Sequence, residues 1–182
     1  MTIPSVRFDN RAGMRRLLEH MLDVHGRRRI VFLRGSEGNE DSIQREAAYR
    51  ELLQERGIAI DPALFGEAAF TELGGESAVQ RLLASKVNFD CVFAGDDEAA
   101  AGVIMALRKS SLRIPEDVAV VGFDDVPMAR HLNPPLTTIR APIETASYLA
   151  ARHLVRLIRN DETDSAMVLP VELVVRQSCG CP

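Results

Sequence analysis

The apolar residues of this chain alternate between short continuous runs and longer periodic stretches. Continuous runs are typical of strands buried on both faces, and they occupy positions 30–33, 91–94 and 118–121. Spacings of three or four are typical of amphipathic helices, and they occur over 43–53, 79–83 and 100–107. Strand and helix therefore alternate, with a weaker strand expected over 64–70. This order predicts parallel strands joined by right-handed crossovers, an α/β fold with a doubly wound sheet.

The two ends of the chain do not follow this alternation. An amphipathic helix precedes the first clear strand, with Met14, Leu17, Leu18, Met21 and Leu22 on its apolar face. Towards the other end we expect a short strand over 136–139 and a long helix over 143–158. The residues from 168 to 175 predict a final strand or hairpin arm. The elements at the two ends are thus expected to lie outside the regular strand–helix alternation of the central layer.

Composition and charge narrow the functional classes. The net charge of −4 gives no basic field that would attract DNA or an anionic membrane, so a DNA-binding element is expected outside these residues. No apolar run approaches the ~20 residues that a membrane helix needs. The first residues lack the pattern of a secretory signal, and three cysteines make no disulfide framework. Cytoplasm is the expected compartment.

Candidate binding residues follow the expected strands. In open α/β sheets, ligands bind at the carboxyl ends of the strands. The residues expected there are carboxylates, one arginine and one aromatic: Asp9, Arg45, Phe70, Asp96 and Asp124. Carboxylates can bridge hydroxyl groups, a guanidinium donates in a fork, and an aromatic face covers C–H bonds. This set suits a neutral polyhydroxylated ligand such as a sugar.

Structural roles compete with binding for several of these positions. Asp97 is expected as the N-cap of the helix that follows it, and Asp125 as the cap of a short helix running toward His131. Phe70 taken alone would be a core residue. Arg45 lies early in a helix, where the dipole disfavours a cation, and this favours a specific role. Asp124 and Arg45 are the preferred binding residues.

Motifs for catalysis are missing from the sequence. The glycine-bearing loop 35–41 lacks the Lys-Ser/Thr of a phosphate-binding loop, and no dinucleotide fingerprint or nucleophile elbow occurs. The histidines at 20, 25, 131 and 153 show no metal-ligand spacing. Cys179-Gly180-Cys181 could bind metal or form a redox pair, with an unremarkable tail as the simpler interpretation. We therefore expect no enzyme, no cofactor and no metal; acidic strand ends holding Mg²⁺ for phosphoryl transfer are the enzymatic alternative.

Two sequence motifs together resemble one known family. The stretch 114–125 reads Ile-Pro-Glu-Asp-Val-Ala-Val-Val-Gly-Phe-Asp-Asp, and 134–139 reads Pro-Pro-Leu-Thr-Thr-Ile. Supporting matches are Phe8-Asp9-Asn10 with Gly13, Arg45, and the segment 89–94 before Asp96-Asp97. From about Pro4 to Ser178 the sequence resembles the effector-binding core of the lactose/galactose repressor (LacI/GalR) family of transcription regulators.

The resemblance implies two Rossmann-like lobes of the type I periplasmic-binding-protein fold, with a ligand cleft between them. It implies that the five candidate residues face this cleft. Residues 1–26 would be a first-lobe fragment, 27–138 the second lobe, 139–164 a crossover helix of the first lobe, and 165–182 a strand and tail returning to the second. It further implies a sugar-like effector, a homodimer, and DNA contacts through a helix-turn-helix domain that these residues do not contain.

Departures from the family pattern leave alternatives open. Asp96 stands where asparagine is usual, which replaces a donor and an acceptor by acceptors alone. The ending Ser-Cys-Gly-Cys-Pro is similar to members in which the sensor precedes a signalling domain. A sensor input for a signalling protein and a periplasmic sugar carrier therefore remain as alternatives to the transcription regulator.

Overall fold

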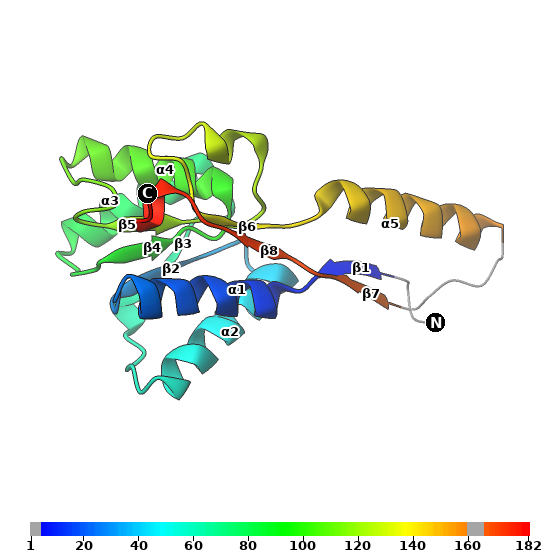
Figure 1. Ribbon diagram of the computed structural model, residues 1–182, viewed down its shortest axis with the longest axis horizontal. Helices are drawn as coiled ribbons and strands as arrows, with labels where there is room; N and C mark the ends of the chain where they lie inside the picture. The colour runs from blue at the N-terminus through cyan, green and yellow to red at the C-terminus, as the bar shows by residue number, and fades with distance from the viewer. Residues whose placement is uncertain (1–4, 160–165) are drawn as a thin grey trace.

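The central feature of the fold is a four-stranded parallel sheet. The computed structural model describes residues 5–159 and 166–182 (Figure 1). The sheet has the order β3-β2-β4-β5, formed by β2 (Ile30–Arg34), β3 (Phe65–Glu67), β4 (Cys91–Phe93) and β5 (Ala119–Val121). All three neighbouring pairs are parallel. The predicted parallel sheet is confirmed.

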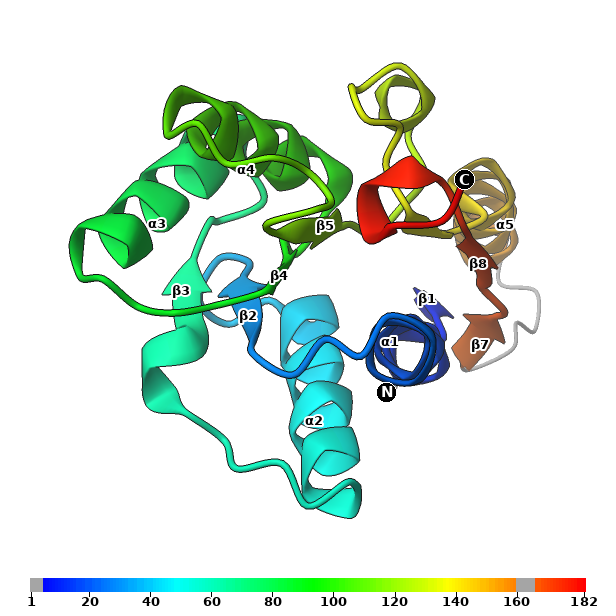
Figure 2. The ribbon, with the colours of Figure 1, turned by 60° about the vertical axis from the view of Figure 1, so that its left-hand side comes forward.

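Helices cover both faces of this sheet (Figure 2). On one face lie α1 (Asn10–Glu19) and α2 (Glu40–Glu55), and on the other α3 (Glu72–Ala84) and α4 (Asp97–Lys109). Successive strand residues point to opposite faces. Ile30 and Phe32 therefore enter the core under α1 and α2, while Val31 and Leu33 enter the core under α3 and α4. The doubly wound arrangement is confirmed.

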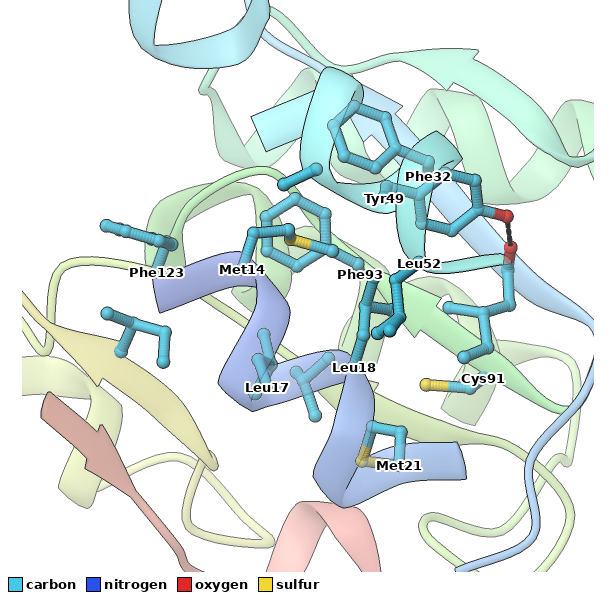
Figure 3. Packing of buried hydrophobic residues seen from close by; sticks show 14 of the residues in the cluster. Met14, Leu17, Leu18, Met21, Phe32, Tyr49, Leu52, Cys91, Phe93 and Phe123 are labelled. Carbon is cyan, nitrogen blue, oxygen red and sulfur yellow. Dashed lines mark hydrogen bonds between the residues drawn. The ribbon is translucent and has the colours of Figure 1, made fainter. Parts of the chain in front are cut away.

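Large apolar side chains fill the core beneath α1 and α2 (Figure 3). Phe32 packs against Tyr49 and Phe93, with ring centroids 5.2 and 5.1 Å away. The Tyr49 hydroxyl donates a 2.7 Å hydrogen bond to the Ile30 carbonyl, so its one polar atom is satisfied inside the core. Met14 and Leu17 of α1 are fully buried in the same cluster. Helix α1 is therefore part of this packed body.

The packing of α1 differs from the expected division into lobes. Residues 1–26 were expected to stay together in a first-lobe fragment. Instead α1 and the π-helical turn η1 (His20–Val24) that continues it send their apolar face into the core of the main sheet. The reason is the periodic apolar face itself, because burying it needs an adjacent core. Among the described residues of this range, β1 (Ser5–Phe8) pairs outside the main sheet, although its last residue, Phe8, packs against the core.

A smaller outlying unit surrounds β1. Strand β1 pairs in parallel with β7 (Ala166–Leu169), and α5 (Ile143–Ile158) packs against β1 (Figure 1). Helix α5 leaves several large apolar side chains exposed: Ile143, Tyr148, Leu154, Val155, Leu157 and Ile158. Its apolar face is thus only partly covered by the residues that the structure describes.

The last segments return to the main body. Strand β6 (Thr138–Arg140) pairs antiparallel with β8 (Glu172–Val174) and continues the sheet through bridges beside the end of β5. The expected final strand over 168–175 is divided between β7 and β8 at Pro170, which has no N–H to donate to a ladder. Three short helices complete the fold: η2 (Pro62–Leu64), η3 (Pro127–Arg130) and η4 (Gln177–Cys179).

Strand β3 is shorter than the sequence predicted. It ends at Glu67, because Ala69 and Phe70 adopt φ values of 52° and 58°, outside the strand region. Phe70 therefore lies on the loop after the strand. Within the described residues, no helix has both the length and the apolar character needed to cross a bilayer.

Candidate functional site

Arg45 occupies the centre of the polar cluster at the carboxyl ends of the strands. It lies on α2, and only 3% of the residue is exposed. Its Nε donates to Asn10 Oδ1 at 2.8 Å, and its Nη1 donates to the Gly95 carbonyl at 2.9 Å. Burial lowers the pKa of Arg45, and nearby carboxylates, Asp124 first, oppose this. A guanidinium keeps its charge even so, and this side chain therefore places a fixed cation beneath the site.

Two aromatic rings flank the Arg45 guanidinium. Its central carbon lies 3.6 Å from the centroid of the Phe123 ring and 5.7 Å from that of Phe70. The Phe70 ring lies across Gly35 and Gly95, where a β-carbon would come within 2.3 and 3.3 Å of it. Glycine at the end of β2 and after β4 thus makes room for an aromatic face beside the cation. Phe70 remains partly exposed, unlike a core residue.

Asp124 stands beside Arg45 without a hydrogen bond to its carboxylate from any described residue. The nearest cationic atom is Arg45 Nη2, 3.8 Å from Oδ1. Its backbone has φ of 105°, a conformation that side chains rarely adopt, and 26% of the side chain is exposed. Burial raises the pKa of Asp124, while Arg45 opposes the rise. The carboxylate therefore lies next to a cation and has lone pairs to offer.

Asp9 and Asp96 both cap helices. The Asp9 carboxylate accepts from the Ala12 amide at the start of α1, and the Asp96 carboxylate accepts from the Ala99 amide at the start of α4. Burial raises the pKa of Asp96 to about 6, and the Ala99 amide opposes this. Asp96 also contributes to the negative field around Arg45. Among the described residues Asp9 makes no ion pair or hydrogen bond with the other four candidates.

The expected roles of Asp97 and Asp125 are wrong. Asp96 caps α4, so Asp97 is the first helical residue, where it accepts from Thr138 Oγ1 at 2.6 Å and the Val126 amide at 2.9 Å. Desolvation raises the pKa of Asp97 to about 7. Asp125 pairs with Arg140 and Arg176, and η3 starts after Val126 without a side-chain cap. Both carboxylates join segments of the fold.

Asn10, Asp41 and Phe123 belong to the cluster but were not chosen as site residues. Asn10 is buried, donates to Asp41 Oδ1 at 2.7 Å and accepts from Arg45, so it links α1 to α2. Its position directly after the strand-end Asp9 was a signal that could have identified it. For Phe123, an apolar residue beside two carboxylates, the sequence pattern did not indicate contact with a guanidinium.

A pocket of about 700 Å³ opens beside this cluster. Asp124 is the one predicted residue that lines it, together with charged side chains from the loop after β5, η3, β6, α5 and the tail: Asp125, Arg130, Arg140, Glu144 and Arg176. Another pocket, of about 760 Å³, is lined by Ile114, Pro115, Asn133 and Cys181 and holds none of the predicted residues. Carboxylates and guanidinium groups therefore line the space next to Asp124.

Of the two places where the sequence offered metal ligands, the described part of the structure gathers ligating side chains around Cys179 and Cys181 but not at the acidic strand ends. In residues 5–159 and 166–182, the acidic strand ends form no group of three that could hold Mg²⁺. The expectation that the histidines show no metal-ligand arrangement is wrong for His20 and His25. Their ring nitrogens converge with the sulfurs of Cys179 and Cys181, all within 4.8 Å of one another. The fold thus brings together residues separated by more than 150 positions.

Comparison with known proteins gives a consistent group of relatives. The HTH-type transcriptional regulator CelR of Thermobifida fusca is 36% identical over 174 residues, which is 95% of this chain and 51% of CelR. GalS of Salmonella typhimurium is 39% identical over 142 residues, 78% of this chain and 42% of GalS. The chain therefore spans about half the length of these curated relatives.

Solved structures show the same likeness. A CelR–cellobiose complex has a TM-score of 0.90 at 35% identity, covering 97% of this chain and 54% of the complex's chain. The lac repressor dimer bound to operator and the anti-inducer ONPF has a TM-score of 0.88 at 25% identity, covering 98% and 53%.

Most of the chain, residues 18–179, also matches the family described as the periplasmic binding protein-like domain. The resemblance to LacI/GalR regulators that the sequence motifs indicated is confirmed by these relatives. The chain belongs to the periplasmic binding protein-like domain family, in the branch of the LacI/GalR transcriptional regulators.

Proposed function

We propose that this chain is the effector-sensing part of a LacI-type transcriptional regulator, a binding module rather than an enzyme. Its ligand is a sugar or a similar small polar molecule, bound at the carboxyl ends of the strands. The named relatives support this assignment, because they are transcriptional regulators and one was solved with cellobiose.

One observation carries the proposed site. Arg45 Nη2 and the Asp124 carboxylate lie 3.8 Å apart, and neither has a hydrogen bond to a described residue. A hydroxyl group both donates and accepts, so a sugar can bridge such a donor and acceptor. The partly exposed Phe70 ring beside them offers a face for C–H bonds. Asp96 has one carboxylate oxygen free beyond its cap, and Asp9 completes the set of ligand-binding residues.

We propose that the outlying unit of β1, β7 and α5 belongs to a first lobe, and that the main body with its returning tail forms the second. The partly covered apolar face of α5 supports this division, since such faces are normally buried in a core. The effector would bind between the lobes and favour one angle between them. A coupling of about 1–3 kcal/mol is sufficient for an allosteric switch.

The partners follow from the same proposal. The protein acts as a homodimer, and it binds DNA through a helix-turn-helix domain outside these residues. The lac repressor structure, a dimer on its operator, supports the dimer and the DNA binding, and the HTH-type names of CelR and GalS support the helix-turn-helix domain. Regulators of transcription act where the chromosome is, so we place the protein in the cytoplasm.

The decisive experiment is isothermal titration calorimetry of the full-length protein with a panel of mono- and disaccharides. We expect one sugar to bind and Asp124→Asn to weaken it by about 10- to 100-fold, because hydrogen bonds to a charged group contribute about 1.5–3 kcal/mol. Asp117→Asn is the matched control, since Asp117 is paired with Arg113 on the surface of the main body. Equal affinity of Asp124→Asn and the unaltered protein would refute the site.

A further inference from the structure

A cluster of two histidines and two cysteines lies outside the effector site. It joins the π-helical turn η1, which follows the last residue of α1, to the C-terminal tail, whereas Asp9 caps the other end of α1. The two Nε2 atoms of His20 and His25 are 3.2 Å apart, and Cys181 Sγ lies 3.4 Å from His25 Nε2 and 3.7 Å from His20 Nε2. Cys179 completes a group whose ligand atoms all lie within 4.8 Å.

These separations match a tetrahedral metal site. Zinc binds cysteine sulfur at about 2.3 Å and histidine nitrogen at about 2.0 Å, so tetrahedral ligands lie about 3.3–3.8 Å apart. The three separations above, 3.2, 3.4 and 3.7 Å, match this range to within about 0.1 Å. The widest, 4.8 Å, exceeds it by about 1 Å, which a small side-chain rotation removes. Two nitrogens and two sulfurs form a donor set that suits zinc.

The backbone on both sides is shaped to bring the ligands together. His20 and His25 are five positions apart, the hydrogen-bonding period of a π-helix, and η1 replaces an ordinary α-helical turn between them. Gly180 separates the cysteines with φ of 115°, and a β-carbon there would lie 3.1 Å from the His25 ring. Only glycine combines this conformation with this close approach.

We propose that His20, His25, Cys179 and Cys181 form a structural zinc site that fastens the C-terminal tail to the end of α1. Four protein ligands leave no open position, so the ion has a structural and not a catalytic role. The tail is also held independently of the ion, because Ser178 Oγ donates to the Val120 carbonyl at 2.6 Å and accepts from the Thr137 amide at 2.8 Å. Variants that lose the metal should therefore still fold.

Cobalt provides the direct test, with the protein stripped by chelator and kept reduced. One equivalent of Co²⁺ should produce the intense visible ligand-field bands of tetrahedral cobalt and a thiolate-to-cobalt charge-transfer band, and Zn²⁺ should displace it. Cys181→Ser and His25→Gln should each weaken Co²⁺ binding by at least about 100-fold, because losing a ligand exceeds the effect of losing an outer-shell partner. Circular dichroism checks that both variants fold.

The control is His131→Gln, which removes an exposed histidine outside the cluster and should leave Co²⁺ binding unchanged. Zinc should raise the melting temperature of the unaltered chain and of this control but not of Cys181→Ser. Cobalt bound without a thiolate band, or bound equally by Cys181→Ser, would overturn the proposal. So would a Cys179–Cys181 disulfide that mass spectrometry still finds after treatment with a thiol reductant, in protein that takes up no metal.

Discussion

At the scale of single residues, the site depends on one buried charge. Removing an ion from water is costly unless its partners replace the lost hydration. Arg45 receives that replacement from the Asn10 amide oxygen, the Gly95 carbonyl and the Phe123 ring. These contacts come from α1, the loop after β4 and the loop after β5. One side chain thus ties three segments together while keeping Nη2 available.

We expect Arg45→Met to destabilise the fold by about 3–5 kcal/mol, because it leaves Asn10, Gly95 and the surrounding carboxylates without their cation. Arg50→Met on the same helix is the control, and it should change stability by at most about 1 kcal/mol, since Arg50 pairs with Glu46 at the surface. Chemical denaturation measures the free energy of unfolding of both variants, provided that their m-values equal that of the unaltered chain. Similar midpoints for the two variants would contradict this role for Arg45.

Asp97 should make stability dependent on pH. Its pKa is about 7 in the folded chain, raised by desolvation from 3.8, so the folded state binds more protons than the unfolded state between these values. Its contribution to the free energy of unfolding therefore falls as pH rises through this window, with a slope of at most about 1.4 kcal/mol per pH unit. Asp97→Asn does not titrate and should make the slope shallower by this contribution, most clearly between pH 6 and 7, above the pKa of about 6 for Asp96.

Urea denaturation at several pH values between about 4 and 8 tests this dependence. Asp117→Asn serves as the control, because Arg113 lowers the pKa of Asp117 to about 2, outside the window. An unchanged slope in Asp97→Asn would show that another group is responsible.

At the scale of elements, the backbones of α3 and α4 pass very close to each other where the helices cross. A β-carbon on Gly102 would lie 1.8 Å from the Glu72 carbonyl oxygen, and one on Gly75 would lie 2.1 Å from the Ala99 carbonyl oxygen. Glycine on each helix lets the two backbones touch. Adding any side chain there forces the helices apart and disturbs the packing of the core beneath them.

We expect Gly102→Ala to destabilise the protein by about 3 kcal/mol despite the higher helix propensity of alanine. Ala101→Ser on the same helix adds one atom at a partly exposed position and should cost less than about 1 kcal/mol. Thermal unfolding compares the two variants. A neutral or stabilising Gly102→Ala would mean that the helices separate without loss of packing.

The pattern of apolar residues predicted the elements of the central layer well, because fully buried strands and amphipathic helices leave clear periods in the sequence. The same pattern did not predict where strands end when their ends are set by pairing with other strands. Strand β3 ends early because Phe70 turns away with positive φ, and the last strand divides at Pro170 because β7 and β8 have different partners. Pairing partners far apart in the chain leave no local signal.

The candidate site was predicted in part for the same reason. The strand-end rule proposed Phe70, Asp96 and Asp124 beside Arg45, and the structure brings these three around the Arg45 guanidinium. Their part in ligand binding stays a prediction. Asp96 caps α4 and Asp97 accepts a hydrogen bond from Thr138. Which of the two neighbours takes which role depends on the residue at which the helix begins, and the sequence pattern does not fix that residue. The histidine–cysteine cluster depends on the π-helical turn η1, which the pattern of apolar residues did not predict.

At the scale of the whole molecule, apolar surface is concentrated on the outlying unit. Leu154 and Ile158 of α5 are 58% and 72% exposed, and Val168 of β7, in the same unit, is also exposed. Contiguous exposed apolar surface favours association. The main body, by contrast, buries its apolar residues in two cores.

We expect the double substitution Leu154→Glu and Ile158→Glu to reduce self-association and hydrophobic-dye binding by the chain, while the main body keeps its stability within about 0.5 kcal/mol. Leu73→Glu, at a single exposed position on α3, should leave dye binding unchanged. Sedimentation velocity and dye fluorescence measure both. Equal dye binding by the double variant and the unaltered chain would mean that the dye binds an apolar surface other than that of α5.

The two parts of the molecule are joined by three short links, between β1 and α1, between β6 and α5, and between β7 and β8. Each link leaves at most two residues between the elements it joins, and the Asp9 amide donates to the Leu169 carbonyl across two of them. Two residues reach only about 7 Å, so the parts can tilt but cannot drift apart. Three short links therefore restrict the relative motion of the two parts to a narrow set of rotations. Cutting any one of them with a protease would leave the pieces attached while freeing a twisting motion that the intact chain forbids.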